Sequence, residues 1–347
     1  MEILVKENNY KINIEYKSDD KLIDFLRGRS ESKFLLITDE NVFSIYRERI
    51  KNIMKDFSYY IFEISPGEGS KSIENYVEIN KFLVENNFNR GDAIISFGGG
   101  VVGDLGGFIA STYLRGIDFI AVPTTLLSMI DSSVGGKNGI NFMDLKNQVG
   151  SFYFPKYVHI DYSFLETLDE RNINNGLAEI FKYSILKDRE LFDYLKSADK
   201  IDYENIIYKS INIKLDFVRD DERDKGKRQK LNLGHTIGHG IESLSNYKLN
   251  HGESIGIGTI YMARAAYKLG LAKDDFYKDL IEAYKNHNLP VHYEFDTDKI
   301  LEVLKHDKKI KNNMINLILP TKIGQVISKK MNFNELREII ELGKDNE

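Results

Sequence analysis

The sequence predicts a protein of two domains: an α/β domain built on a mostly parallel sheet, then a mainly α-helical domain. The chain has 347 residues, more than a single core usually holds. Short apolar runs alternate with helical patterns in the first half, whereas helical periodicity dominates after about Leu165, apart from strand-like runs at Ile315–Leu319 and Gln325–Ser328. We therefore expect domains at residues 1–165 and 166–347.

The expected strands of the first domain begin with a pair at Glu2–Lys6 and Tyr10–Tyr16, joined across Asn8-Asn9, a dipeptide that tolerates tight turns. Longer helical patterns such as Ile73–Asn86 separate the strands that follow. Those strands are expected at Phe34–Ile37, Tyr59–Ile64, Ala93–Phe97, Phe119–Val122 and Tyr157–Ile160. Such alternation implies parallel strands with helices on both faces of the sheet.

Composition narrows the class of protein. Hydrophobic residues make up 42% and charged residues 29%, the balance of an ordinary globular chain. The net charge of -5 removes the simplest argument for nucleic-acid binding, and no apolar stretch is long enough for a membrane helix. Because Met1–Tyr16 alternates like a strand and is unlike an export signal, we expect a cytoplasmic location. With no cysteine, any metal must be held by His, Asp or Glu.

A glycine-rich loop at Ser96–Gly107 follows a predicted strand and precedes a predicted helix. Glycines let the backbone approach phosphate groups, and the N–H groups at a helix start stabilise negative charge. A tight turn without a ligand would leave three consecutive glycines unexplained, so nucleotide binding is the better interpretation. The polar segments Thr38–Asn41 and Pro66–Lys71 close other strands; each alone is more often a cap or turn, and together they suggest a cofactor.

A second loop, Pro123–Lys137, ends on Gly135-Gly136-Lys137 and is followed by Asn141, Lys146 and Asn147. A lysine that emerges from two glycines reaches a phosphate or carboxylate in one interpretation and is an ordinary surface lysine in the other. Lys137 alone does not decide between them.

Three of the seven histidines fall within seventeen positions. His235 and His239 lie four apart, which places both imidazoles on one helical face, and His251 follows. Glu179 is a carboxylate in a helical pattern and could complete a His/His/carboxylate site for zinc or a similar ion. A lone histidine is more often structural, and spacing does not choose which of the three bind metal.

Charged and polar residues flank this cluster in the sequence. They are Lys214, Asp221–Asp224, Arg228, Asn232, Lys308 and Lys309. Charge runs usually mark solvated faces, but lysine and arginine beside a metal would form a pocket for a substrate that carries phosphate and carboxylate. The residues by themselves indicate a metal- and nucleotide-dependent enzyme acting on a small anionic metabolite.

Four segments resemble the 3-dehydroquinate synthase family in order and spacing, and the resemblance covers almost the whole chain. The segments are Gly98–Gly107, Pro123–Lys137, Gly176–Tyr183 and Leu231–Glu242. The resemblance implies an N-terminal NAD-binding domain with a Rossmann-like sheet, a helical C-terminal domain that binds one zinc or cobalt ion, and a substrate closed between the two in a homodimer.

The family's binding residues transfer to matching positions of this sequence. Glu179, His235 and His251 are the implied metal ligands, and His239 is left near the substrate to handle a proton. The implied NAD contacts are Asp39, Asn41, Glu68, Lys71, Gly99, Gly100, Val101, Asp104, Thr124, Thr125, Lys146 and Thr167. The implied substrate contacts are Asn147, Lys214, Arg228, Asn232 and one of Lys308 or Lys309, with Arg115 supplied by the neighbouring subunit. Lys137, Lys182, Asp131 and Asp224 join His239 as implied catalytic residues.

The implied reaction converts 3-deoxy-D-arabino-heptulosonate 7-phosphate to 3-dehydroquinate by transient oxidation with NAD, phosphate elimination, reduction, ring opening and aldol closure. Four positions depart from the family pattern: Asn138, Phe142, Asp169 and Asp224, where Thr, His, Pro and Glu are usual. The alternatives are another sugar phosphate cyclase, a metal-dependent polyol dehydrogenase and a catalytically silent binding protein. Arg228, Asn232 and the Lys308-Lys309 pair favour a substrate with a carboxylate.

Overall fold

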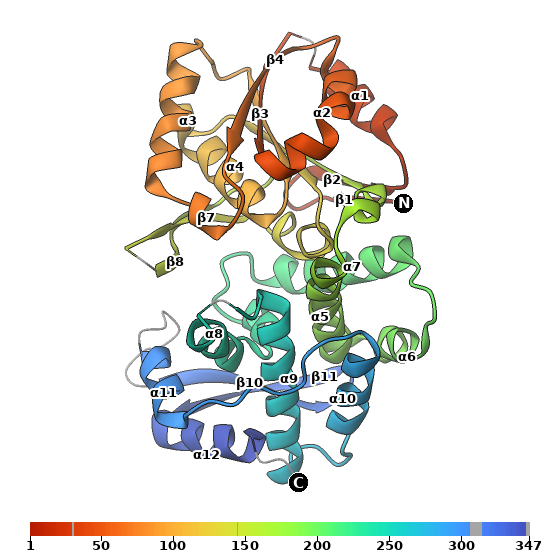
Figure 1. The fold of residues 1–347 in the computed structure, drawn as a ribbon, viewed down its shortest axis with the longest axis vertical. Coiled ribbons are helices and arrows are strands. Elements are labelled where there is room, and N and C mark those ends of the chain that lie inside the picture. Colours follow the sequence, from red (N-terminus) through yellow and green to blue (C-terminus); the bar gives the residue numbers. More distant parts are fainter. Residues whose placement is uncertain (30, 144, 247, 306–313, 345–347) are drawn as a thin grey trace. The chain divides into compact units, whose positions relative to one another are not determined.

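The computed structural model describes residues 1–29, 31–143, 145–246, 248–305 and 314–344. The chain divides into two compact units, which are coloured in sequence order in Figure 1. Unit 1 comprises Met1–Asp169 and Tyr203–Ile211, and unit 2 comprises Glu170–Asp202 and Asn212–Glu347. A short segment of the second half of the sequence therefore belongs to the first unit.

Unit 1 contains a seven-stranded sheet in the order β1-β2-β9-β6-β5-β3-β4. The strands are β1 (Glu2–Val5), β2 (Tyr10–Glu15), β3 (Lys33–Asp39), β4 (Ser58–Ile64), β5 (Ala93–Gly98), β6 (Asp118–Pro123) and β9 (Tyr157–Asp161). Only β1 and β2 pair in antiparallel fashion, and every other pair in this sheet is parallel. The predicted parallel sheet is confirmed, and each of its strands matches an apolar run of the sequence.

The strand order has a topological switch point between β3 and β5. From β3 the chain moves outward to β4, then returns to the other side of β3 and continues through β5, β6 and β9. Crossovers that run in opposite directions place their helices on opposite faces, and ligands bind where the direction changes, outside the carboxyl ends of the strands. Asp39 closes β3 and Gly98 closes β5, so the polar segments of the sequence meet at this edge.

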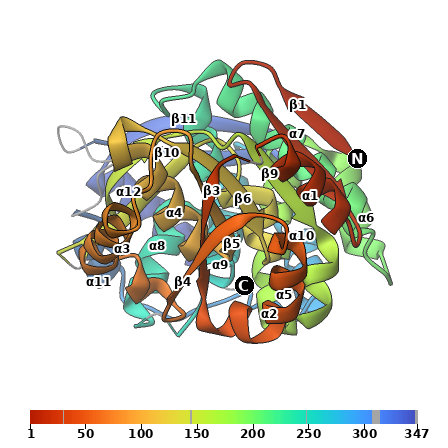
Figure 2. The same cartoon turned by 90° about the horizontal axis from the view of Figure 1, so that it is seen from above.

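Four helices cover the sheet. They are α1 (Asp19–Arg27), α2 (Glu40–Met54), α3 (Ile73–Glu85) and α4 (Gly100–Thr112). α1 contacts α2, and α3 contacts α4, which itself lies against β3, β5 and β6 (Figures 1 and 2). Side chains cap two of these helices: Asp39 accepts from the Val42 amide at 3.0 Å and Ser72 from the Asn75 amide at 3.2 Å.

An antiparallel hairpin of β7 (Lys137–Phe142) and β8 (Leu145–Phe152) follows the predicted loop Pro123–Lys137, in a segment for which no strand was predicted. Unit 1 also contains four short helical segments: Glu68–Ser70, Tyr113–Arg115, Ser128–Ser132 and Tyr162–Thr167. The two hairpin strands approach closely at Gly139 and Gly150, where a Cβ on Gly150 would lie 2.3 Å from the Asn138 carbonyl oxygen. Lys137 thus begins a strand and is exposed.

Unit 2 is helical around a central helix, α9 (His251–Lys268), which contacts α5, α8, α10, α12 and β10. Its other elements are α5 (Glu170–Lys187), α6 (Arg189–Ser197), α7 (Tyr203–Asp220), α8 (His235–Leu244), α10 (Tyr277–Asn286), α11 (Thr297–Lys305), β10 (Met314–Lys322), β11 (Gln325–Asn332) and α12 (Phe333–Lys344). The residues of α9 from Gly252 to Ala266 are all buried. The first part of α7, Tyr203–Ile211, groups with unit 1.

None of the described helices is both long enough and apolar enough to span a membrane.

Candidate functional site

The three clustered histidines lie on two helices that pack tightly against each other. His235 and His239 are one turn apart on α8, and His251 is the first residue of α9. Two glycines allow this approach. Gly234 has a left-handed backbone, with φ of +75°, and a Cβ on Gly258 would lie 2.3 Å from the Gly234 carbonyl oxygen. A side chain at either position would push the histidines apart.

The start of α9 is fixed by a capping box. The Asn250 side chain accepts from the Glu253 amide at 3.0 Å, and the Glu253 carboxylate accepts from the Asn250 amide at 2.8 Å. Arg171 of α5 also donates to Glu253 at 2.7 Å. These bonds hold the first turn of α9, and with it His251, against α5.

Glu179 of α5 completes the cluster. One ligand atom from each of Glu179, His235 and His251 lies within 4.8 Å of the others. The Oε1 atom of Glu179 is 3.7 Å from Nε2 of His235 and 3.4 Å from Nε2 of His251. Two imidazoles and a carboxylate around one point are the donor set of an open, catalytic type of zinc site. The structure therefore brings together the three residues named as metal ligands.

The hydrogen bond at the other ring nitrogen of His235 supports this role. Its Nδ1 lies 3.0 Å from the Leu233 carbonyl oxygen, which only an N–H can satisfy. The proton is therefore assigned to Nδ1, and the lone pair of Nε2 points toward Glu179 and His251. The donor atoms of Glu179, His235 and His251 fit a divalent metal in type and position.

His251 faces a second carboxylate that sequence reasoning did not single out. Its Nδ1 lies 3.8 Å from Oε2 of Glu242, and His239, Glu242 and His251 form another group of possible ligands. Burial lowers the pKa of His251, but the carboxylates of Glu179 and Glu242 outweigh it and raise that pKa to about 9. Glu242 lies three residues after His239 on α8, so helical spacing from a histidine was the available signal.

The cationic residues predicted near the metal are in unit 2 and mostly buried. Lys182, Lys214 and Arg228 are buried, and Lys182 pairs with Glu179 within α5. Arg228 donates to the Glu222 carbonyl oxygen at 2.7 Å, and Asn232 donates to that of Gln229 at 3.0 Å. Lys308 and Lys309 lie outside the described residues.

One carboxylate organises the loop that carries Arg228 and Asp224. Asp221 accepts from the amides of Lys225, Gly226 and Arg228 at 2.8, 2.6 and 3.1 Å. Burial raises the pKa of Asp221, but these backbone hydrogen bonds and the charge of Arg228 have a larger, opposite effect. The pKa of Asp221 is therefore lowered. Asp224 has a left-handed backbone within this loop, with φ of 56°.

In unit 1 several of the predicted nucleotide residues lie at the switch point. Gly99 is the N-cap of α4 and Gly100 its first residue, and a Cβ on Gly99 would lie 3.3 Å from Cγ2 of Thr125. Thr124 donates its amide to the Gly98 carbonyl oxygen at 3.0 Å. Val101 and Asp104 are on the first turns of α4, and Asp39 and Asn41 are at the start of α2. The amides of a helix N-terminus therefore point to an edge lined by small residues.

A buried lysine, Lys71, contacts three of the other predicted residues. Nζ of Lys71 lies 2.6 Å from Asp104, 2.5 Å from Asn147 and 3.6 Å from Glu68. Burial alone would lower the pKa of Lys71, but Asp104 and Glu68 reverse this and raise it, so the ammonium stays charged. Asn141 donates to Glu68 at 3.0 Å and accepts from the Asn147 amide at 2.9 Å, which adds it to the network.

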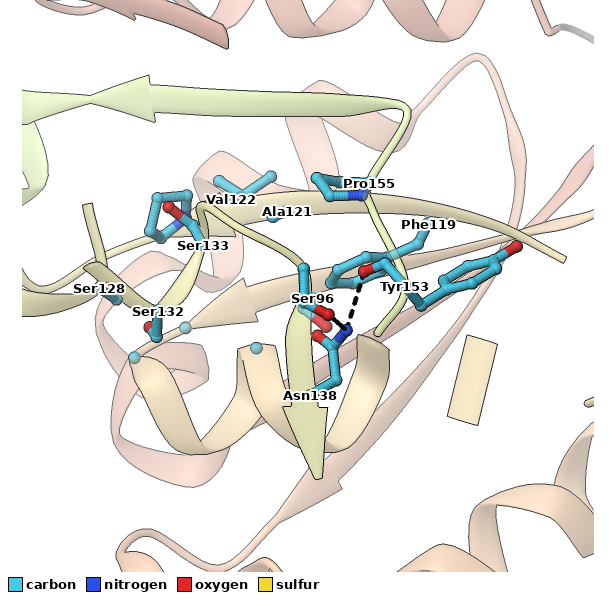
Figure 3. Close-up of a pocket in the computed structure, with 15 residues that line it drawn as sticks. Ser96, Phe119, Ala121, Val122, Ser128, Ser132, Ser133, Asn138, Tyr153 and Pro155 are labelled. Atoms are coloured by element: carbon cyan, nitrogen blue, oxygen red, sulfur yellow. Dashed lines mark hydrogen bonds between the residues drawn. The ribbon is translucent and has the colours of Figure 1, made fainter. Parts of the chain in front are cut away.

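A cavity whose surface is mostly apolar lies beside the glycine-rich loop (Figure 3). Ser96, Ser132, Ser133 and Tyr153 line it together with Asn138, one of the departures from the family pattern. Asn138 donates to the carbonyl oxygens of Gly136 at 2.9 Å and Tyr153 at 2.8 Å. The side-chain oxygen of Asn138 lies only 2.0 Å from the position that a Cβ on Gly107 would take, so a side chain there would collide with it. Asn138 therefore ties together the two ends of the hairpin where Lys137 emerges.

The remaining predicted residues of unit 1 are spread along its loops and the hairpin. Asp131 lies in the helical turn Ser128–Ser132, Lys146 lies in β8, and Thr167 lies near the end of the unit, where its hydroxyl bonds that of Tyr46. Arg115 and its neighbour Leu114 both have left-handed backbones, with φ of 69° and 49°.

A further cluster, Asp19, His159 and Asp161, has ligand atoms within 4.8 Å of one another in unit 1. Arg49 donates to Asp19 at 2.9 Å and also to Asp161, so a guanidinium already supplies the positive charge there. Asp161 in addition accepts from the amides of Lys17 and Ser18 at 2.9 and 3.0 Å. This cluster is therefore a structural ion-pair network.

Comparison with known proteins agrees with this geometry. The family model for the N-terminal part of 3-dehydroquinate synthase matches residues 61–175, and that for the C-terminal part matches residues 176–310. A 3-dehydroquinate synthase from Caldanaerobacter subterraneus subsp. tengcongensis is 40% identical over 334 residues, which cover 93% of this chain and 94% of that protein.

Solved structures of related cyclases have the same fold. ValA, a 2-epi-5-epi-valiolone synthase from Streptomyces hygroscopicus subsp. jinggangensis with NAD+ and Zn2+ bound, superposes with a TM-score of 0.88 and 26% identity over 97% of this chain and 96% of that one. A 2-deoxy-scyllo-inosose synthase complexed with carbaglucose-6-phosphate, NAD+ and Co2+ gives a TM-score of 0.86 over 95% of this chain and 96% of that one, and at 24% identity it shows the fold alone.

Proposed function

This chain belongs to the 3-dehydroquinate synthase family, and we propose that it converts 3-deoxy-D-arabino-heptulosonate 7-phosphate to 3-dehydroquinate and phosphate. The observation that carries the proposal is the match of the family models across residues 61–310, which include the triad Glu179, His235 and His251. The protein is thus a carbon–oxygen lyase that eliminates phosphate and closes a carbocycle.

NAD is the proposed redox cofactor, bound by unit 1 at the carboxyl ends of β3 and β5. The N-terminus of α4 and the glycines at its start suit a diphosphate, and Asp39 suits a ribose hydroxyl. Bound NAD supplies a reversible hydride acceptor, so that the substrate is oxidised and later reduced without net consumption of cofactor. The NAD bound to ValA supports this assignment.

One divalent ion is the proposed metal, held in unit 2 by Glu179, His235 and His251. Zinc and cobalt are the candidates, because both suit nitrogen and oxygen donors and each accompanies NAD in one of the related structures. The bound metal supplies a Lewis acid that lowers the pKa of a substrate hydroxyl before oxidation.

The side chains around these sites have complementary proposed roles. His239, half-buried one turn from His235, takes or holds the proton of the substrate hydroxyl. Lys182, Lys214 and Lys137 bind the phosphate as ammonium groups, and Asn147 donates to the same anion. Oxidation acidifies the neighbouring C–H, so phosphate leaves once that proton is removed, and an oxygen of the leaving phosphate is the proposed acceptor. Asp131 and Asp224 orient the substrate and the lysines that bind it.

Recognition of the carboxylate separates this function from that of the related cyclases. Arg228 and Asn232, with Lys308 or Lys309, are the proposed carboxylate ligands, since a guanidinium matches a carboxylate with two parallel hydrogen bonds. A metal-dependent polyol dehydrogenase is the other enzymatic alternative, and it would release NADH at each turnover.

The test offers the purified, metal-loaded protein the seven-carbon acid phosphate and, in parallel, sedoheptulose 7-phosphate, which lacks the carboxylate. We expect turnover of the acid to exceed that of sedoheptulose 7-phosphate by about 1,000-fold or more, and the Arg228→Met variant to lose most of that preference. Preference for sedoheptulose 7-phosphate would assign the chain to another cyclase activity. Steady NADH accumulation with a simple polyol would assign it to a dehydrogenase.

A homodimer formed through the β7–β8 hairpin is also proposed. Phe142, Met143, Leu145 and Val149 expose apolar side chains on this hairpin, and Leu114 does so beside Arg115. The Ser151 and Ser111 hydroxyls bond at 2.7 Å, which places β8 against the end of α4 that leads to Arg115. An apolar hairpin next to a strained arginine suits a subunit contact that delivers Arg115 to the partner's substrate.

A further inference from the structure

The Glu179 carboxylate in α5 has two oxygens with different neighbours. Oε1 faces Nε2 of His235 at 3.7 Å and Nε2 of His251 at 3.4 Å. Oε2 pairs with Nζ of Lys182, three residues later on the same helix. One oxygen is therefore directed to the two imidazoles and the other to an ammonium group.

Both members of this pair are buried. Glu179 is fully buried and Lys182 is 2% exposed, with its Nζ also 4.7 Å from the centre of the Tyr183 ring. Charges at such depth are weakly screened, so each strongly affects the other and any cation placed beside them. Helical spacing fixes the geometry, because residues i and i+3 share one face of α5.

We propose that Lys182 sets the metal affinity of this site, by holding Oε2 of Glu179 so that the carboxylate offers one oxygen, and by placing a positive charge beside the ion. The inference deepens the proposed function, since it rests on the metal site described above. Lys182 is a positioning residue in this role, in addition to any contact with substrate. Its ammonium weakens metal binding, and it compensates the buried carboxylate whenever the metal leaves.

The experiment compares wild type with Lys182→Met, which keeps the length and apolar stem of the side chain but removes its charge. Zinc affinity is measured by competition with a coloured chelator at pH 7.5, and thermal unfolding is followed with and without metal. We expect the zinc affinity of K182M to exceed that of wild type by about tenfold or more, because a like charge close to the ion has been removed. Its metal-free form should unfold at a lower temperature than metal-free wild type, so that zinc raises its Tm by more.

Cobalt absorption supplies a readout of geometry. The visible bands of Co2+ weaken as its coordination number rises, so release of Oε2 from Lys182 should weaken the bands of cobalt-loaded K182M relative to wild type. Should K182M fold only in the presence of zinc, metal-dependent refolding followed by circular dichroism would show the same compensation. Lys182→Arg keeps the charge and should retain zinc affinity close to that of wild type.

Lys187→Met is the matched control, because Lys187 is on the same helix and pairs with Asp216 at the surface. Its zinc affinity should equal that of wild type. Zinc binding by K182M that is equal to or weaker than that of wild type, with an unchanged metal-induced Tm shift, would overturn the inference. Failure of wild type to bind zinc, or undiminished binding by Glu179→Gln, would instead refute the proposed metal site.

Discussion

At the scale of single residues, clustering in the sequence identified groups that the fold brings together. Glu179, His235 and His251 come from three helices, yet their ligand atoms lie within 4.8 Å of one another. Glu242 escaped notice because a glutamate on a helix resembles an ordinary surface residue. The environment of His159 was equally hidden, since it depends on Asp19 and Arg49, more than a hundred residues earlier in the chain.

Asp221 provides a test of how the proposed substrate loop is held. Asp221→Asn replaces an oxygen that accepts backbone N–H groups with an N–H donor, so the loop around Arg228 should shift. We expect kcat/KM to fall by about ten- to 100-fold, mainly through KM, while bound metal is retained. Steady-state kinetics and metal analysis provide the check. Asp220→Asn, at an exposed neighbour, should change kcat/KM by less than about twofold, and an equal effect of both variants would contradict this role.

His159 provides a test of pH-dependent stability. Neither ring nitrogen has a hydrogen-bond partner among the described residues, and burial, the largest cause, lowers the pKa of His159 to about 4 despite the nearby carboxylates of Asp161, Asp19 and Asp20. The unfolded chain therefore binds this proton more readily. The contribution of the buried, neutral His159 ring to folding stability is therefore fully present above about pH 6.5 and is lost as the pH falls toward 4.

On going from pH 7.5 to pH 5, we expect the free energy of unfolding to fall by about 2 kcal/mol because of proton uptake by His159 in the unfolded chain. His159→Leu removes the titrating group, so its own loss over that range should be smaller by about this amount. Urea unfolding of both proteins at the two pH values measures the difference. Equal pH dependence in wild type and variant would show that His159 is not buried as a neutral ring.

At the scale of helices and strands, the elements that could be predicted are those whose burial leaves a regular apolar pattern in the sequence. The inner strands of the sheet are apolar because helices cover both of its faces, so they were predicted as continuous runs. The β7–β8 hairpin was missed because glycines and polar residues interrupt its alternation and its pairing depends on Gly139 and Gly150. The close contact of α8 with α9 likewise depends on Gly234 and Gly258, which the sequence alone does not pair.

That contact is testable at Gly258. A Cβ there would lie 2.3 Å from the Gly234 carbonyl oxygen, so Gly258→Ala should separate the helices that carry the histidines. We expect a loss of about 2 kcal/mol or more in stability and weaker zinc binding. Thermal unfolding and chelator competition measure the two effects. Gly28→Ala, where the nearest atom is 3.4 Å away, should change neither appreciably, and unaltered zinc affinity in G258A would contradict the packing argument.

At the scale of the whole molecule, the order of the two fold types was predicted from the sequence, but the return of one later segment to the first unit was not. Residues Tyr203–Ile211 group with unit 1 although they follow 33 residues of unit 2, Glu170–Asp202. Such a return depends on tertiary packing and leaves no local pattern in the sequence. The predicted domain limits, cytoplasmic location and homodimer stay predictions.

The dimer prediction concerns the exposed hairpin. Phe142 is 42% and Met143 79% exposed, so Phe142→Asp places a charge within an apolar patch. We expect the wild type to sediment as a dimer and F142D as a monomer with an unchanged circular dichroism spectrum, because burying an unpaired carboxylate opposes association. Val84→Asp, at an exposed residue on α3, is the control. A monomeric wild type, or an F142D variant that remains dimeric, would remove the hairpin as the subunit contact.

Phosphate release from 3-deoxy-D-arabino-heptulosonate 7-phosphate is the most direct test of the proposed activity. The assay uses metal-loaded protein with a catalytic amount of NAD, alone, after EDTA treatment and as the His251→Ala variant. We expect phosphate and dehydroquinate in equal amounts without net NADH, with loss of activity after EDTA treatment and in H251A. Absence of phosphate release from a protein that binds both NAD and metal would contradict the proposed activity.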